Sequence, residues 1–457
     1  MKVLLTVPFY SYRGSHPNLP DIALGYLASA VEDISMVKII DWNNRQSIET
    51  LCREISAYMP DIIGIKCFTV NYRAVKMTVS LLKRLVPQAV IILGGPHPTS
   101  SIPSDIREEF PETDLVILGE AENIFRRIVL MLKEDRLKNL VADLKGLPGT
   151  IAPEFGIMND EINIIDNLNT LLMPRWDLLD PRTYRSSPVS RRFSKFPLAP
   201  VMATRGCPTG CKFCSVERIS GKTIRKREAE SIFNEMDLLY HKYGVRQFMF
   251  TDNSFSADIE TVQRLSELIR KNSMEIGYNM IAGPGFTRLY SSRDMNSLRL
   301  SGLESVVFGI ESASNPVRKA FCMGPSIEEI SSSINKVVSA GIDVLGFFMI
   351  GFPREDMKDI KKTMDYSEKP FFDFVSWEIV SPYPGTGLYS QYIKDRGIKK
   401  IDWTKFKRQN ISLSKENNHS RNLFRIIRKK EIRCFLKKNM FFNTRIIKLL
   451  IKYILGF

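Results

Sequence analysis

The sequence predicts an α/β protein with two consecutive sheets of parallel strands. Short apolar, β-rich runs alternate with helical patterns through the first 140 residues, and a second series of the same kind fills residues 201–387. A proline-rich stretch separates the two series, and a basic stretch with helical periodicity follows them. We therefore expect a doubly wound parallel sheet (1–140), a connector (141–200), a partial (β/α)6 barrel (201–387) and a helical basic C-terminal region (388–457).

The first region contains five strand–helix units. Strands are predicted at 2–7, 36–40, 61–66, 89–93 and 114–118, and helices at 21–32, 46–58, 71–85, after 93, and at 122–134. Units of this kind form a Rossmann-like sheet, which binds its ligand at the carboxyl ends of the strands. Those ends carry Gly94, Gly95, His97, Gly119 and Glu120. Glycine is useful there because a flat ligand can lie against bare backbone.

The connector has irregular hydrophobicity and seven prolines between 148 and 200. Since proline is confined to turns and edges, we expect loops and a small β element rather than a core. The run 171–180 (L-L-M-P-R-W-D-L-L-D) is apolar enough to pack at a domain junction. For Arg175 and Trp176 we favour a packing role over a position facing a ligand.

The sequence pattern of the second region predicts six strand–helix units. Strands are expected at 201–205, 246–251, 275–281, 305–310, 342–350 and 374–380, with helices at 228–243, 258–271, 291–301, 326–340 and 356–366. In barrels of parallel strands the chemistry takes place on the carboxyl-end loops. Polar or glycine residues fall at those ends: Asp252, Asn253, Glu311, Ser312 and Gly351.

Cys207, Cys211 and Cys214 form the pattern C-x₃-C-x₂-C directly after the first strand of the second region. Three thiolates so close in a loop can converge on one soft metal centre, which is what an iron–sulfur cluster needs. Because a 4Fe–4S cluster takes four ligands, three cysteines leave one iron open to bind a small molecule. A zinc site or three unligated thiols are the alternatives, although zinc usually takes four ligands and no second Cys or His pair lies nearby.

The cysteine spacing, with Phe213 just before the last cysteine, resembles the radical S-adenosylmethionine (radical SAM) superfamily. The resemblance implies that Glu311, followed by Ser312, binds the ribose hydroxyls of S-adenosylmethionine. It also implies that Phe213 and Gly351 contact the adenine, and that Asp252 and Asn253 lie near the methionine moiety or the substrate. The alternatives are that Glu311 pairs with an arginine, and that the pair at 252–253 forms a turn or helix cap.

The first region resembles the cobalamin-binding domain that often precedes a radical SAM domain. The loops G-G-P-H-P-T and L-G-E-A-E carry this resemblance, which implies cobalamin contacts by Gly94, Gly95, His97, Gly119 and Glu120. The motif D-x-H-x-x-G, whose histidine ligates cobalt from below in many such domains, is absent from the sequence. Alternatively, the region is a Rossmann-like module that has lost its ligand or holds a substrate, and His97 fixes a turn.

The C-terminal region carries most of the formal net charge of +15, because residues 405–457 contain 15 Lys and Arg against two Glu. Arg445, Lys448 and Lys452 lie on one helical stripe among apolar residues, which favours a helix lying on a membrane surface. A helix packed on the barrel and a nucleic-acid-binding segment are the alternatives. Single scattered cysteines, the absence of a signal peptide and the absence of a long apolar run predict a cytoplasmic protein, with peripheral contact at the inner membrane surface as a further hypothesis.

Together these resemblances imply an enzyme that uses a 4Fe–4S cluster to cleave S-adenosylmethionine to a 5′-deoxyadenosyl radical, and cobalamin to methylate an unactivated carbon. The expected partners are a small-molecule or lipid-like substrate and a one-electron donor such as flavodoxin or ferredoxin, with no nucleic acid. An anaerobic oxidative cyclase or another radical rearrangement is the nearest alternative. A non-catalytic iron–sulfur or nucleic-acid-binding protein is the alternative from another class.

Overall fold

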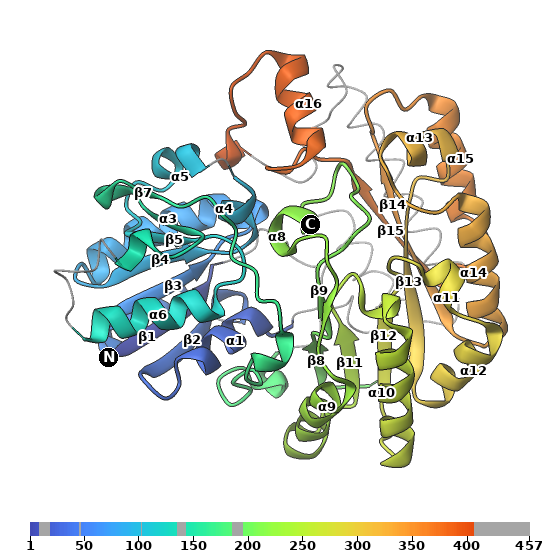
Figure 1. Cartoon of the computed structure of the whole chain (residues 1–457), viewed down its shortest axis with the longest axis horizontal. Helices are drawn as coiled ribbons and strands as arrows, with labels where there is room; N and C mark the ends of the chain where they lie inside the picture. Colours follow the sequence, from blue (N-terminus) through green and yellow to red (C-terminus); the bar gives the residue numbers. More distant parts are fainter. Residues whose placement is uncertain (9–18, 45–46, 102, 135–142, 185–194, 406–457) are drawn as a thin grey trace. The chain divides into compact units, whose positions relative to one another are not determined.

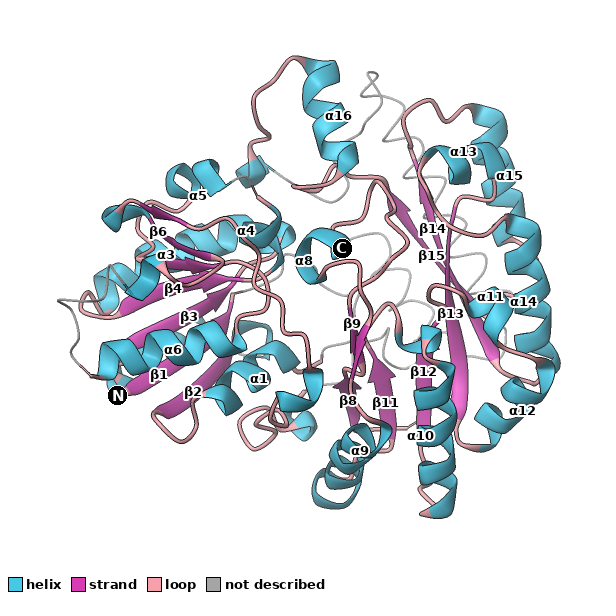
Figure 2. Ribbon diagram, in the orientation of Figure 1, coloured by secondary structure: helices cyan, strands magenta, loops and turns pink. Residues whose placement is uncertain are grey.

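The computed structural model describes residues 1–8, 19–44, 47–101, 103–134, 143–184 and 195–405 (Figures 1 and 2). The basic tail and its three alternatives therefore lie outside the described residues. The chain forms two compact units. The first comprises Met1–Ser186, Ser215–Gly221 and Tyr383–Phe406, and the second contains Ser187–Cys214 and Lys222–Pro382. Within the described ranges, every helix is too short or too polar to cross a membrane.

The sheet of the first unit has the strand order β2-β1-β3-β4-β5-β6-β7. Its first five strands are parallel, and the last two are antiparallel additions. Because the chain runs outward from β1 first to one side and then to the other, right-handed crossovers place helices on both faces. The predicted doubly wound sheet is confirmed. Its strands are β1 (Lys2–Val7), β2 (Met36–Asp41), β3 (Ile62–Lys66), β4 (Val90–Gly94), β5 (Leu115–Ile117), β6 (Thr150–Ala152) and β7 (Ile157–Met158).

The helices of the first unit begin where the sequence offers caps. Asp21 and Ser47 accept hydrogen bonds from the first turns of α1 and α2. In α3 the buried residues Val75, Val79 and Leu82 recur at helical spacing, so one face packs on the sheet. The helices are α1 (Ile22–Ala30), α2 (Ile48–Tyr58), α3 (Tyr72–Leu85), α4 (Pro96–Ser100), α5 (Pro103–Glu109), α6 (Glu122–Lys133), α8 (Val216–Ser220) and α16 (Gly387–Arg396).

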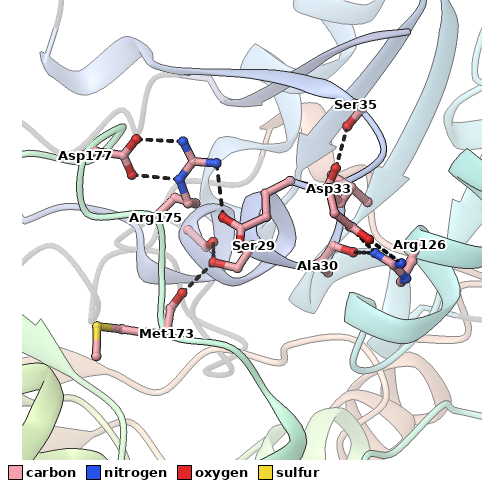
Figure 3. A network of polar contacts seen from close by, with 11 residues as sticks. Ser29, Ala30, Asp33, Ser35, Arg126, Met173, Arg175 and Asp177 are labelled. Atoms are coloured by element: carbon pink, nitrogen blue, oxygen red, sulfur yellow. Dashed lines mark hydrogen bonds and ion pairs between the residues drawn. The ribbon is translucent and has the colours of Figure 1, made fainter.

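The connector adds to the first unit in two ways. Its small β element, β6 and β7, extends the sheet, and the run 171–180 packs against α1. The Ser29 hydroxyl donates to the Met173 carbonyl at 2.5 Å (Figure 3). Arg175 pairs with Glu32 at 3.2 Å. Trp176 is buried, in keeping with a packing role. The small β element was expected, whereas the contribution of the connector to the core of the first unit was not.

The second unit contains six parallel strands in the order β15-β14-β13-β12-β11-β8. Consecutive strands are neighbours, and the two end strands, β8 and β15, are not paired with each other, so the barrel is partial (Figure 2). The predicted strand 201–205 is divided between β8 and the short β9 (Thr204–Arg205), which pairs with β10 (Arg225–Lys226). The six strands are β8 (Leu198–Val201), β11 (Gln247–Phe250), β12 (Gly277–Ile281), β13 (Leu303–Glu311), β14 (Asp343–Ile350) and β15 (Phe374–Ile379).

Helices line the outer face of this sheet (Figure 1). Five were predicted: α9 (Ala229–Tyr243), α10 (Ile259–Lys271), α12 (Ser292–Leu300), α14 (Ile327–Ser339) and α15 (Met357–Ser367). Two short helices, α11 (Phe286–Leu289) and α13 (Asn315–Ala320), were not, because neither is long enough to show a period. Along β14, Phe348 stacks on Trp377 while Phe347 on the opposite face is 41% exposed. Alternate residues of the strand therefore face a packed side and an open side.

We expect Gly119→Ala to destabilise the first unit. Gly119 follows β5 with φ +85°, and a Cβ there would collide with the Asn163 backbone carbonyl. Gly156→Ala is the matched control, because Gly156 also has positive φ (+66°) but nothing lies within 4 Å of its missing Cβ. In the control, the free energy of unfolding should fall only by the cost of the left-handed conformation, about 1–2 kcal/mol. In Gly119→Ala it should fall by about 1–3 kcal/mol more. Denaturant unfolding of both variants tests this, and equal losses would contradict it.

Candidate active site

The loop that carries the three cysteines follows β9 in the second unit. Gly206 (φ +92°) and Gly210 (φ +69°) adopt positive φ values in this loop, which glycine tolerates without strain. The Ser254 hydroxyl donates to the Gly206 carbonyl at 2.7 Å, which fixes the start of the loop. The Lys212 backbone N–H donates to the carbonyl of Phe321 at 3.1 Å, which fixes its middle. The loop is therefore held between the end of β11 and the residues that follow α13.

The three thiols differ in exposure but interact electrostatically. Cys207 and Cys211 are partly buried, and Cys214 is exposed. Burial, followed by the neighbouring Cys214, Glu311 and Cys207, raises the pKa of Cys211 to about 12, and the Arg318 charge opposes the rise. Iron binding replaces the thiol protons, so we expect higher pH to favour cluster assembly.

The donor set suits an iron–sulfur cluster. Among the residues that the structure describes, no three His, Cys, Asp or Glu side chains already surround one metal position. Nevertheless, the three cysteines supply only soft sulfur donors, and they lie on one loop whose glycines let the backbone turn tightly. These residues fit three irons of a 4Fe–4S cluster, with the fourth iron left for another ligand.

Glu311 ends β13 in an unusual backbone conformation. Its φ is +59°, and the register between β13 and β14 shifts next to it. A non-glycine residue held there is strained, which is characteristic of functional positions. Burial raises the pKa of Glu311 to about 7, with Arg318 opposing and Glu378 adding to the rise. Within the described part of the chain its carboxylate makes no hydrogen bond or ion pair, and Arg318 acts on it as a nearby charge.

Asp252 lies at the carboxyl end of β11 but braces the backbone. Its carboxylate accepts from the backbone N–H groups of Ala203 (3.1 Å) and Thr204 (3.0 Å) and from the Thr204 hydroxyl (2.7 Å). Burial raises its pKa to about 6, and these hydrogen bonds oppose the rise. The side chain thus joins the end of β11 to the chain that leads into the cysteine loop. Direct contact with S-adenosylmethionine was expected, whereas the geometry favours a supporting role.

Asp252→Asn should lower the free energy of unfolding by about 1–3 kcal/mol, because an amide NH₂ would replace an oxygen that accepts hydrogen bonds. Asp237→Asn is the control, since Asp237 is 43% exposed on α9 and its loss should cost less than about 0.5 kcal/mol. Denaturant unfolding and iron content after reconstitution are the measurements. If the two variants have the same free energy of unfolding, Asp252 does not brace the loop.

The other predicted residues of the second unit lie at the same carboxyl edge. Asn253 is exposed next to Asp252. The Ser312 hydroxyl is buried against Thr363 at 3.3 Å, so a supporting role suits it better than a ligand contact. Phe213 packs edge-to-face on Phe352 with ring centroids 5.7 Å apart.

Gly351 has φ +93°, and its N–H donates to Glu355 at 2.7 Å. Glu355 was not predicted. It also accepts from the Phe352 N–H at 3.2 Å, and burial raises its pKa to about 7. This carboxylate fixes the loop in which Gly351 and Phe352 lie. The sequence could have indicated Glu355, because this carboxylate lies only three residues after Phe352 and can reach the backbone of the same loop.

In the first unit, His97 is a core residue and not a loop residue. It belongs to α4 and is 1% exposed. Its Nδ1 lies 3.0 Å from the Thr69 hydroxyl and its Nε2 3.2 Å from Glu109, so both ring nitrogens have partners. Its ring also packs edge-to-face on Tyr72 and Trp403. The prediction that the His97 side chain contacts cobalamin is therefore not supported by its position.

Glu120 also serves the fold. It is buried, its Oε2 accepts from the Ile165 N–H at 2.8 Å, and its N–H donates to the Asn163 carbonyl at 2.9 Å. These bonds join the end of β5 to the connector. Gly119 makes the same close approach to Asn163. Both residues are better explained by this contact than by a ligand.

Gly94 is the predicted residue that leaves backbone open at the carboxyl edge of the first sheet, whereas Gly95 is packed against other backbone. A Cβ on Gly94 would meet only the Ile117 carbonyl oxygen, at an ordinary 3.7 Å. Gly95 has φ +102° and lies close to the Cys67 backbone. The edge therefore fits a flat ligand that rests on backbone, which is compatible with cobalamin held without a protein histidine at this position.

Two stretches of the chain match known protein families. Residues 201–367 match the Radical SAM superfamily, and residues 15–129 match the B12 binding domain. The first match includes β11 to β14 of the second sheet, and the second includes β2 to β5 of the first sheet. They identify the two types of domain that the cysteine motif and the strand-end glycines had suggested.

Individual relatives cover most of the chain. It is 27% identical over 443 residues to an uncharacterized methyltransferase of Pyrococcus horikoshii, covering 96% of this chain and 93% of the relative. It is 24% identical over 423 residues to the anaerobic magnesium-protoporphyrin IX monomethyl ester cyclase of Cereibacter sphaeroides, covering 89% and 66%. The solved structure of the cobalamin-dependent S-adenosylmethionine radical enzyme OxsB, with aqua-cobalamin and S-adenosylmethionine bound, matches with a TM-score of 0.73 and 16% identity, covering 100% and 70%. At that identity the likeness concerns the fold.

Proposed function

We propose that this chain, which belongs to the radical SAM enzymes that carry a B12-binding domain, methylates an unactivated carbon of a small-molecule substrate. A 4Fe–4S cluster with S-adenosylmethionine supplies a 5′-deoxyadenosyl radical, and cobalamin supplies the methyl group. The observation that carries the proposal is the convergence at one sheet edge of the three-cysteine loop and the unpaired, strained Glu311. Relatives of this type are named as methyltransferases.

In this proposal each residue at the edge of the second sheet has a separate task. Cys207, Cys211 and Cys214 ligate three irons of the cluster. Glu311 accepts hydrogen bonds from the two ribose hydroxyls, for which a carboxylate with no internal partner is well suited. Phe213, packed on Phe352, provides an apolar wall for the adenine.

Cobalamin would rest on the carboxyl edge of the first sheet at Gly94 and Gly95. Since both nitrogens of His97 have partners inside the core, His97 does not ligate the cobalt. The cofactor should therefore bind through backbone and shape, and replacement of His97 should affect the stability of the first unit more than the cobalt spectrum.

Oxidative cyclisation is the second candidate, because one relative is a magnesium-protoporphyrin ester cyclase that aligns with 89% of this chain. Both reactions begin with removal of a hydrogen atom from carbon. They differ in whether a methyl group is then added. A one-electron donor is required in either case, and a flavodoxin or ferredoxin remains our proposal for it.

Anaerobic reconstitution with iron, sulfide and hydroxocobalamin tests the proposal. We expect about four irons, about four sulfides and about one cobalt per chain, and release of 5′-deoxyadenosine from S-adenosylmethionine on reduction. With S-adenosylmethionine labelled in its methyl group, label on cobalamin or on an acceptor supports methyl transfer. Cleavage without any transfer of label would favour the cyclase, and failure to hold a cluster would overturn both reactions.

A further inference from the structure

Arg318 is a buried cation near the candidate site, and the family resemblance gives it no role. It belongs to α13, which follows β13 in the chain, and is 3% exposed. Figure 1 labels this helix. A guanidinium is rarely buried without a carboxylate or another set of acceptors. Its surroundings therefore indicate what it does.

The guanidinium donates to backbone carbonyls on both sides of Glu311. Nη1 of Arg318 donates to the carbonyls of Ile310 (2.5 Å) and Ser312 (3.0 Å). These carbonyls flank the residue whose φ is +59°. Since a strained conformation persists only where its surroundings fix it, the two bonds account for how Glu311 is held.

The same guanidinium holds the turn on which the cysteine loop rests. Its Nε and Nη2 donate to the carbonyls of Pro325 (2.8 Å) and Met323 (3.1 Å). One residue earlier, the Cys322 carbonyl lies 3.4 Å from the Cys211 sulfur. The Phe321 carbonyl accepts from the backbone of Lys212. One planar group thus joins the strand end that carries Glu311 to the turn that supports the cluster ligands.

We propose, resting on the function proposed above, that Arg318 is a positioning residue for S-adenosylmethionine cleavage: its fork fixes Glu311 relative to the cysteine loop, and its buried charge raises the reduction potential of the cluster. Its charge interacts with Glu311 and with Cys211. Net charge and hydrogen bonding around a cluster are what set its potential. Lysine carries the positive charge but lacks the forked guanidinium. An Arg318→Lys variant therefore separates the effect of the hydrogen bonds from the effect of the charge.

The experiment compares Arg318→Lys and Arg318→Met in the reconstituted full chain. Both should weaken S-adenosylmethionine binding by about tenfold or more, because neither can hold four carbonyls. Only Arg318→Met should shift the cluster midpoint potential, towards more negative values, in a redox titration followed by electron paramagnetic resonance. Iron content and unfolding are measured alongside.

Arg246→Lys and Arg246→Met are the matched controls. The Arg246 guanidinium also donates to two backbone carbonyls, those of Tyr240 and Val245, but it precedes β11 at the amino edge of the same sheet. These variants should change stability without changing affinity or potential.

If Arg318→Lys binds S-adenosylmethionine as the wild type does, the positioning role is wrong, even where Arg318→Met fails to fold. Equal potentials in the wild type and Arg318→Met would overturn the electrostatic part. A wild-type chain that neither holds a cluster nor cleaves S-adenosylmethionine would overturn the proposed function, and this inference with it. A competent wild type with unaffected Arg318 variants would overturn the inference alone.

Discussion

Cys211→Ala should abolish the iron–sulfur cluster and reduce S-adenosylmethionine cleavage to background, a loss of at least about a thousandfold. Cys211 interacts electrostatically with Cys207, Cys214 and Glu311, which places it near both other thiols. Two cysteines cannot hold a cubane that needs three protein ligands. The measurements are iron and sulfide content, the absorbance of the reconstituted protein and the yield of 5′-deoxyadenosine. Cys207→Ala and Cys214→Ala should behave alike.

Cys322→Ala is the control for this result. Cys322 is exposed, and it approaches Cys211 only through its backbone carbonyl, which alanine retains. Its φ of +55° is equally unfavourable for cysteine and alanine. The variant should therefore keep the cluster. Loss of the cluster in Cys322→Ala, or its retention in Cys211→Ala, would show that the ligands have been assigned wrongly.

Glu311→Gln should weaken S-adenosylmethionine binding by about tenfold to a hundredfold, because a neutral amide replaces the carboxylate that accepts from the ribose hydroxyls. The pKa of Glu311 is raised to about 7 in the ligand-free protein. Affinity in the wild type should therefore increase as the pH rises through 7 and the acceptor ionises. In Glu311→Gln this step should be missing. Equilibrium dialysis between pH 6 and pH 8 measures both effects.

The contribution of Glu311 to the stability of the folded protein should fall as the pH rises, whereas the affinity for S-adenosylmethionine should increase. The folded-state pKa of Glu311 lies above its ordinary value of 4.5, so the folded protein holds this proton more tightly than the unfolded chain does. Its contribution to stability is complete below pH 4.5 and is lost as the pH rises from 4.5 through 7. Since Asp252 and Glu355 are shifted in the same direction, only the difference between wild type and Glu311→Gln isolates it.

Glu378→Gln provides the matched control for the pH effect. The charge of Glu378 raises the pKa of Glu311, so its removal should move the midpoint of the affinity step to lower pH while binding at pH 8 is kept. An unchanged midpoint would contradict the electrostatic coupling. Full affinity in Glu311→Gln at every pH would contradict the ribose contact itself.

The alternation of strands and helices could be predicted because it depends on local patterns. Runs such as 2–7 and 342–350 form β1 and β14 because apolar and β-branched residues there match a buried strand. The three cysteines could be assigned for the same reason, since their spacing within one loop limits where their sulfur atoms can lie. Charge, composition and motif spacing follow directly from the sequence, so these predictions needed no knowledge of tertiary contacts.

The roles of His97, Asp252 and Arg318 were decided by the tertiary structure. The partners of His97 are 12 and 28 residues away, and Asp252 braces residues 48 and 49 positions earlier. A histidine or carboxylate at a strand end can face a ligand or satisfy buried backbone, and only the folded chain shows which groups need a partner. Sequence spacing therefore determined which chemistry the chain carries, whereas long-range hydrogen bonding decided which polar residues remain available to perform it.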